Sequence, residues 1–175
     1  GLRFWVIAET FDGTDWTGAT MDRLTAQLNE LRPYVDNSVT FSYSHYYSPH
    51  IVDNGFHKTY MEYMRSGELE TMPPTAPYGL RAALRGDFSV LLAWEESQDN
   101  MGVCGYYVLR NGKRIANLQV GRKNGNTGMT KAATNFVDGD AAPEKDHLYE
   151  VQAYDFAGNI SQNNETVVVA IRQPF

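Results

Sequence analysis

Apolar and polar residues follow two different periods along the chain. Between residues 4 and 66, short apolar runs alternate with segments in which apolar residues recur every three or four positions, which predicts strands followed by amphipathic helices. From about residue 78 onward, short runs are separated by turn-forming residues, which predicts strands without helices. The pattern therefore predicts an α/β segment followed by an all-β domain.

Two strands are predicted in the first segment. Phe4–Ala8 is a continuous apolar run of strand length, which is typical of a strand covered on both faces. Val39–Ser44 alternates between apolar and polar residues, which predicts a second strand. A strand, a long crossover and a second strand imply parallel pairing.

Each predicted strand is followed by a predicted helix. Thr20–Arg32 carries its apolar residues at helical spacing, and either Thr17 or Thr20 is placed to cap the start of this helix. Apolar residues between Phe56 and Met64 define the second helix, which Gly67 is placed to end. The first segment is thus expected to run strand, helix, strand, helix.

Such a segment is incomplete by itself. Two parallel strands do not make a stable sheet, and parallel sheets are normally buried on both faces. We therefore expect a fragment of a larger α/β fold, whose missing strands come from upstream sequence or from a partner. The unpaired sheet edges also predict a tendency to associate with a second copy.

A proline-rich linker separates this first segment from the rest of the chain. The proline-rich stretch "SGELETMPPTAP" is a linker by composition, which predicts a division into residues 1–67, 68–77 and 78–175. Seven short strands in about 100 residues suggest an antiparallel β-sandwich. "RNGK" is a predicted hairpin turn, and "VGRKNGNTGMT" a predicted mobile loop. The predicted strands are Gly79–Leu84, Phe88–Trp94, Gly105–Arg110, Arg114–Val120, Ala133–Val137, His147–Tyr154 and Thr166–Arg172.

Four stretches of the second segment carry a resemblance. "PPTAPYGLRA", "VLLAWEES", "VCGYYVLRNGKRI" and "LYEVQAYDFAGNIS" resemble a bacterial fibronectin type III domain over roughly Pro74 to Arg172. In this resemblance Trp94 and Tyr107 match core residues, and Tyr149 matches the corner tyrosine of the family.

A second resemblance concerns the first segment. "FWVIAETF", "QLNEL" and "VTFSYSHYYSP" resemble the last two β/α units of a TIM barrel from an uncharacterised group of bacterial glycoside-hydrolase-like proteins. The resemblance implies that Glu9, at the end of a barrel strand, is a catalytic nucleophile or stabilising carboxylate. A second carboxylate would then come from an earlier strand. The alternative is that Glu9 only caps a loop or pairs with an arginine.

Aromatic residues surround both predicted strand ends. Aromatic rings suit the apolar faces of sugars, so these side chains are candidates for a substrate-binding rim. The alternative is that they pack between a strand end and the following helix. The candidate substrate-binding residues are Trp16, Tyr43, His45, Tyr46 and Tyr47.

The remaining candidate residues do not indicate a functional site. The spacing of His45, His50 and Asp53 matches no established ligand pattern, so we expect neither a metal nor a cofactor. Cys104 is the single cysteine, which excludes an intrachain disulfide, and it is expected to be a half-buried strand residue. The "RGD" triplet at Arg85–Asp87 falls in a predicted tight turn, where glycine and aspartate are ordinary residues.

Composition and charge limit the kinds of partner that we expect this protein to bind. The net charge is −6, and the residues up to Met72 hold 10 acidic against 5 basic side chains, which argues against nucleic-acid binding. No apolar run approaches the length of a membrane span.

Two functions remain open from sequence. In the first, the chain is the C-terminal part of a bacterial, extracytoplasmic glycoside-hydrolase-like protein, inactive alone because half a carboxylate pair cannot hydrolyse a glycosidic bond. In the second, it is a non-catalytic module that presents a carbohydrate- or protein-binding surface.

Overall fold

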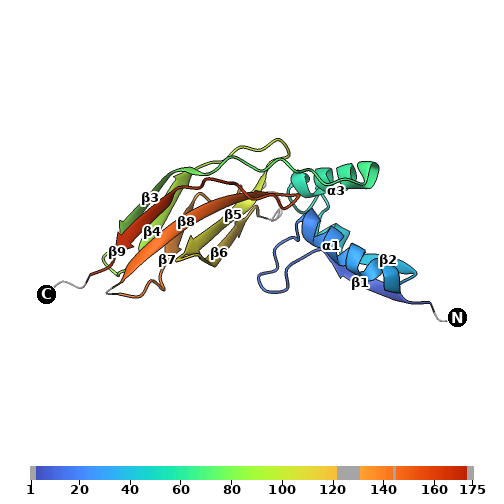
Figure 1. The fold of residues 1–175 in the computed structure, drawn as a ribbon, viewed down its shortest axis with the longest axis horizontal. Coiled ribbons are helices and arrows are strands. Elements are labelled where there is room, and N and C mark those ends of the chain that lie inside the picture. Colours follow the sequence, from blue (N-terminus) through green and yellow to red (C-terminus); the bar gives the residue numbers. More distant parts are fainter. Residues whose placement is uncertain (1–2, 122–130, 144, 173–175) are drawn as a thin grey trace.

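The computed structural model describes residues 3–121, 131–143 and 145–172. Helices and two strands lie at one end of the elongated molecule, and a β-sandwich lies at the other (Figure 1). The predicted loop at Val120–Thr130 falls largely outside the described residues.

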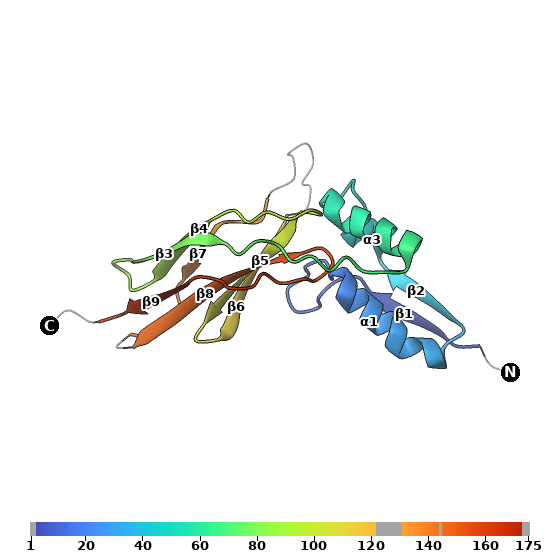
Figure 2. The ribbon, with the colours of Figure 1, turned by 45° about the horizontal axis from the view of Figure 1, so that its top comes forward.

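The first segment has the predicted order of elements. Strand β1 and strand β2 pair in parallel, with Trp5 opposite Asn37 and Glu9 opposite Phe41. Helix α1 lies along this small sheet (Figure 2), so the strand–helix–strand prediction is confirmed. The elements are β1 (Trp5–Glu9), α1 (Met21–Leu31), the 3-10 turn η1 (Arg32–Tyr34), β2 (Asn37–Phe41), α2 (Tyr43–Tyr46) and α3 (Asn54–Ser66).

The second strand is shorter than predicted. Val39–Ser44 was expected to be extended, but β2 ends at Phe41, and Tyr43 begins the one-turn helix α2. The Tyr43 hydroxyl is 2.6 Å from His57 Nδ1 on α3, and its ring packs against Tyr60. Contacts with a helix that follows later in the chain therefore override the local alternation of apolar and polar residues.

The two long helices are capped in different ways. Asp53 accepts a hydrogen bond from Gly55 N–H at the start of α3, and Gly67 ends that helix with a φ of 75°, as predicted. Thr20 precedes α1 but its side chain makes no capping hydrogen bond, so the predicted threonine cap is wrong. The cap of α1 comes instead from the sandwich.

The small sheet is covered on one face only. Ala8 is fully buried toward α1, whereas Trp5 and Ile7, which point the other way, are each 66% exposed. The parallel register places the exposed Val39 and Phe41 on this same uncovered face. The face is apolar, and no strand of the described chain pairs with the outer edge of either strand.

The second segment is the predicted sandwich of two antiparallel sheets. One sheet has the order β3-β4-β7 and the other the order β6-β5-β8-β9. Positive φ angles at Asn111 and Gly112 form the predicted hairpin turn between β5 and β6. The strands are β3 (Tyr78–Leu84), β4 (Val90–Glu95), β5 (Val103–Arg110), β6 (Lys113–Gln119), β7 (Asn135–Asp138), β8 (Asp146–Asp155) and β9 (Thr166–Ala170).

Buried aromatic residues fill the space between the sheets. Trp94 packs edge-on against Tyr106 with ring centroids 5.5 Å apart, and Tyr149 donates a hydrogen bond of 2.7 Å to Asp138. Trp94 and Tyr149 thus lie in the core, as predicted, but Tyr107 does not. Because side chains alternate along β5, Tyr106 points into this core, and Tyr107 stacks outside it on Tyr154 at 4.2 Å.

A second hydrophobic core joins the two segments. Phe156 follows β8 and meets Phe56 of α3 edge-on at 4.8 Å. Cys104 is fully buried in this core rather than half-buried, and burial raises the pKa of its thiol. The core consists of Ala8, Phe11, Met21, Leu24, Tyr46, Tyr47, Val52, Phe56, Cys104, Tyr154 and Phe156.

Backbone hydrogen bonds also cross the junction. The N–H groups of Met21 and Asp22, the first two residues of α1, donate to the carbonyl oxygens of Phe156 and Ala157 at 3.0 and 2.9 Å. The turn after β8 therefore satisfies two of the four donors that a helix N-terminus leaves unpaired. Asn159 of the same turn donates to the Glu70 carbonyl in the proline-rich segment at 3.0 Å, which ties that segment down as well.

Asp155 is the buried acid of this turn. It accepts hydrogen bonds from the N–H groups of Gly158 and Asn159, yet burial raises the pKa of its carboxyl to about 6 from an ordinary 3.8. The folded protein consequently binds this proton more tightly than the unfolded chain does.

The close approach of Gly55 to Phe156 predicts a stability effect. A Cβ at Gly55 would lie 2.0 Å from the Phe156 ring, so Gly55→Ala should lower the free energy of unfolding by about 2–3 kcal/mol. Gly13→Ala is the control, because a Cβ there meets nothing within 4 Å. Chemical denaturation of both variants checks this prediction. Equal stability of the two would show that the junction accommodates the added methyl group without loss of stability.

Asp155 predicts a pH dependence. Because its pKa is raised in the folded state, stability conferred by its proton is full below about pH 4 and is lost as the pH rises through about 6. We expect wild type to lose about 2 kcal/mol relative to Asp155→Asn between pH 4 and 7, because one unit of pKa difference corresponds to about 1.4 kcal/mol. Parallel curves for the two proteins would contradict this.

Candidate functional site

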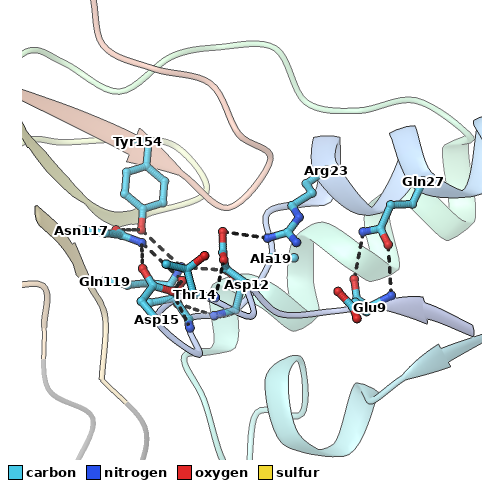
Figure 3. Close-up of polar contacts among 12 residues, drawn as sticks. Glu9, Asp12, Thr14, Asp15, Ala19, Arg23, Gln27, Asn117, Gln119 and Tyr154 are labelled. Carbon is cyan, nitrogen blue, oxygen red and sulfur yellow. Dashed lines mark hydrogen bonds and ion pairs between the residues drawn. The ribbon is translucent and has the colours of Figure 1, made fainter. Parts of the chain in front are cut away.

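Glu9 is the last residue of β1 and lies on the uncovered face of the small sheet. Its backbone is fixed by Gln27 of α1, whose amide accepts from Glu9 N–H at 3.2 Å and donates to Glu9 O at 3.1 Å (Figure 3). The carboxylate is exposed and makes no hydrogen bond or ion pair with the described part of the chain. No arginine of the described ranges pairs with Glu9, and Arg23 pairs instead with Asp12 at 3.0 Å.

A tight loop joins Glu9 to α1. Phe11 pairs with Gly18 in an isolated antiparallel bridge, and Asp12 N–H donates to Thr17 O at 2.8 Å. Asp12 also accepts from Thr14 N–H, and this hydrogen bond lowers the pKa of the Asp12 carboxyl. The loop turns back at Trp16, which has a φ of 60°. The hydrogen bonds within this compact loop fix the position of Trp16, which follows Glu9 by a few residues in the sequence.

Three aromatic rings are stacked at the loop that follows Glu9. Phe11 lies between Trp16, at 5.2 Å and 5°, and Tyr46, at 5.1 Å and 18°. Phe41 meets the Phe11 ring edge-on at 6.3 Å. Trp16 is 64% exposed and Phe41 is also exposed, whereas Tyr46 is buried. The stack therefore holds one broad aromatic face toward solvent at the carboxyl end of the parallel strands.

The structure separates the predicted rim residues into different roles. Tyr47 is 1% exposed, donates to Ala19 O at 2.9 Å and stacks on Phe56, so it belongs to the core and is no rim residue. Burial raises the pKa of its hydroxyl. Tyr46 is buried beneath Phe11 and supports the exposed ring rather than presenting its own. The packing alternative fits both, because Tyr47 packs on Phe56 and Tyr60 of α3 and Tyr46 packs on Phe11.

The other predicted rim residues lie nearer the surface. Tyr43 is half-buried and engaged with His57, as described above, and His45 is exposed with Nδ1 2.8 Å from the Ser42 hydroxyl. His50 is exposed, and Asp53 caps α3. Within the described residues, no group of three or more histidine, cysteine, aspartate or glutamate side chains is placed to hold a metal ion.

Two residues at this site were not predicted. Phe11 and Phe41 organise the aromatic stack, yet neither was predicted as a site residue, and Phe41 was predicted only as part of a strand. Phe11 stands two residues after Glu9 in "FWVIAETF", and this spacing was the available signal. Pairing of Phe41 with Glu9 depends on the register of β1 and β2, which no local pattern reveals.

The site continues into the junction with the sandwich. A hollow of about 460 Å³ lies between the two segments, lined by Trp16 and Tyr46 on one side and by Leu118 and Gln119 of β6 on the other. The "RGD" triplet is remote from this region, in the exposed turn between β3 and β4. No described helix is both long enough and apolar enough to span a membrane.

Comparisons with known proteins relate the chain to carbohydrate-active enzymes. Chitinase Chi52 of Paenibacillus xylanexedens is 36% identical over 100 residues, which are 57% of this chain and 17% of that protein. Chitinase D of Niallia circulans is 39% identical over 91 residues, which are 52% of this chain and 15% of that protein. The chain therefore spans less than one fifth of the length of either relative. No protein-family model matches it.

A Fn3-like protein from Clostridium thermocellum shares 20% identity and a TM-score of 0.38, over 60% of this chain and 96% of that one. The strand order of the two sheets, with Trp94 and Tyr149 in the core between them, agrees with the fibronectin type III resemblance. The C-terminal part of the chain therefore has the two-sheet sandwich that the resemblance predicts.

The aromatic stack predicts unequal effects on stability. Phe11 is buried between two rings, so Phe11→Ala should lower the free energy of unfolding by about 3 kcal/mol. Trp16→Ala removes an exposed ring and should cost less than about 1 kcal/mol. Thermal or chemical unfolding of both variants measures the difference. A large loss from Trp16→Ala would mean that this ring serves packing and not an exposed surface.

Proposed function

We propose that this chain is the C-terminal part of a bacterial glycoside-hydrolase-like protein. In this proposal, residues 1–67 are the last two β/α units of a TIM-barrel-like domain, residues 68–77 connect the parts, and residues 78–175 form the accessory fibronectin type III domain. Glu9 supplies one carboxylate of the catalytic pair, and Trp16 contributes to the surface that binds the glycan.

The uncovered face of the small sheet carries the proposal. Trp5, Ile7 and Glu9 point to one side, where the register adds Val39 and Phe41, and the helix lies on the other side. In a β/α barrel, helices cover the outer face of each strand and side chains of the inner face fill the barrel. A bare apolar face of this composition is the arrangement expected when further parallel strands complete the fold.

The position of Glu9 on that face supports a chemical role. It is the last residue of its strand, and active sites of β/α barrels lie at the carboxyl ends of the strands. Its carboxylate has no partner among the described residues, so it is available to a ligand. Hydrolysis needs a second carboxyl group about 5–10 Å away, which in this proposal is supplied from outside the chain. The chain alone is then inactive.

The relatives indicate the class of substrate. Three of them are chitinases, and others are an alpha-amylase, a gellan lyase and an exoglucanase, all of which are named for reactions on polysaccharides. We therefore propose a neutral glycan as the ligand, with soluble chitin oligosaccharides as the first compounds to test. Polymers of this kind lie outside the bacterial cytoplasm, so an extracytoplasmic location is part of the proposal.

The test is made in the complete protein that contains this chain. Glu9→Gln keeps the size of the side chain and the backbone contacts with Gln27, so the fold should be unchanged while turnover of chitin oligosaccharides falls by about 10²–10⁴-fold. Glu30→Gln is the matched control and should retain full activity. Glu30 is an exposed carboxylate like Glu9, but it lies on α1. Undiminished turnover by Glu9→Gln would falsify the catalytic role and favour a non-catalytic binding module.

A further inference from the structure

Two side chains of the fibronectin type III domain hold the loop that displays Trp16. Gln119 of β6 accepts from Gly18 N–H at 2.7 Å and donates to Gly18 O at 2.9 Å, so its amide pairs with Gly18 as a neighbouring strand would. Asn117, two residues earlier on β6, donates to Asp15 at 3.2 Å and to Thr17 Oγ1 at 3.3 Å (Figure 3). The loop is thus fastened from behind by residues about 100 positions away in sequence.

The two amides are themselves fixed by a buried hydroxyl. Tyr154 donates to Asn117 Oδ1 at 2.7 Å, and Gln119 Nε2 donates to the Tyr154 oxygen at 3.3 Å. Tyr154 is buried, and its ring is stacked on Tyr107. Each amide therefore has its orientation set by the sandwich before it meets the loop, which lowers the entropy lost when the loop is ordered.

The held residues are those that determine where Trp16 lies. Thr17 and Gly18 follow it directly, and Trp16 itself has a φ of 60°, which is unfavourable for a bulky residue. A Cβ at Gly18 would lie 2.7 Å from the Phe56 ring, so the loop is pressed against α3 on one side and held by β6 on the other. Strained backbone of this kind persists only where surrounding contacts determine it.

We propose that Asn117 and Gln119 are positioning residues for the glycan-binding surface. By fixing the β1–α1 loop, they hold the Trp16 ring in the orientation that stacks on a sugar next to Glu9. The fibronectin type III domain is then a working part of the binding site and not a spacer. This inference rests on the proposed function, because it assumes that Trp16 contacts the glycan.

Loosening the loop should weaken binding without changing the chemical step. If Trp16 contacts the sugar equally in the ground state and the transition state, its mispositioning raises the KM and leaves kcat nearly unchanged. A residue needed only for folding would lower the amount of active protein and thus the apparent kcat. The ratio of the two effects separates positioning from structural support.

Gln119→Met is the variant best suited to the test. Methionine has nearly the volume of glutamine, so packing at the junction is kept while both hydrogen bonds to Gly18 are lost. Gln152→Met is the matched control, because Gln152 lies in the same sheet on β8 and, within the described part of the chain, its side-chain amide bonds only Glu150. Hydrogen exchange at Gly18 N–H reports directly on whether the loop has been released.

The experiment is a double-mutant cycle in the complete protein, with a soluble chitin hexamer as the probe. Trp16→Ala should raise the KM about tenfold and Gln119→Met about threefold to fivefold, with faster exchange at Gly18 and unchanged kcat. Gln119→Met added to Trp16→Ala should raise the KM no further. Binding of the hexamer to the same variants in a Glu9→Gln background gives the corresponding Kd values without hydrolysis.

The outcomes distinguish the inference from the proposed function. Additive effects of the two substitutions, or a normal KM in Gln119→Met, would overturn the positioning role while leaving the catalytic role of Glu9 intact. An unchanged KM in Trp16→Ala would also overturn it, since Gln119 would then have no ring to position. Loss of the Glu9 role would show separately, as full turnover by Glu9→Gln.

Discussion

The rest of the structure depends on the contact between the start of α1 and the turn after β8. Carbonyl groups of Phe156 and Ala157 accept the first two N–H groups of the helix, and the Phe156 side chain enters the core shared with α3. Unpaired N–H groups buried at a helix end are costly, so the helix and the sandwich stabilise one another. This junction sets the position of α1, and through Gln27 on that helix it sets the backbone of Glu9.

The same junction anchors the small sheet, although one face of that sheet is bare. On the opposite face, Ala8 of β1 is buried in the core that α1, α3 and the sandwich share, whereas β2 lies at the border of this core and has no buried residue. The exposed apolar front and the exposed Glu9 are both consequences of this one-sided packing. Support from the sandwich allows a two-stranded sheet to hold its geometry where two strands alone would be marginal.

Sequence patterns predicted most of the elements because their causes are local. Helical spacing, the stop at Gly67, the turn at Asn111 and the alternation along the sandwich strands all depend on neighbours within a few residues. The misplaced features depend on distant residues. Tyr43 left its predicted strand for contacts with α3, Thr20 lost its capping role to Phe156, and Tyr106 took the core position expected for Tyr107.

Residue chemistry alone marked Glu9 as a candidate, since a carboxylate directly after an apolar strand is evident in the sequence. Which aromatic side chains surround it could not be read in the same way. Tyr46 and Tyr47 are adjacent and chemically identical, yet one supports an exposed ring and the other fills the core. Local pattern determined the elements and the carboxylate, whereas register and long-range packing decided which rings reach solvent, because burial depends on residues far apart in the chain.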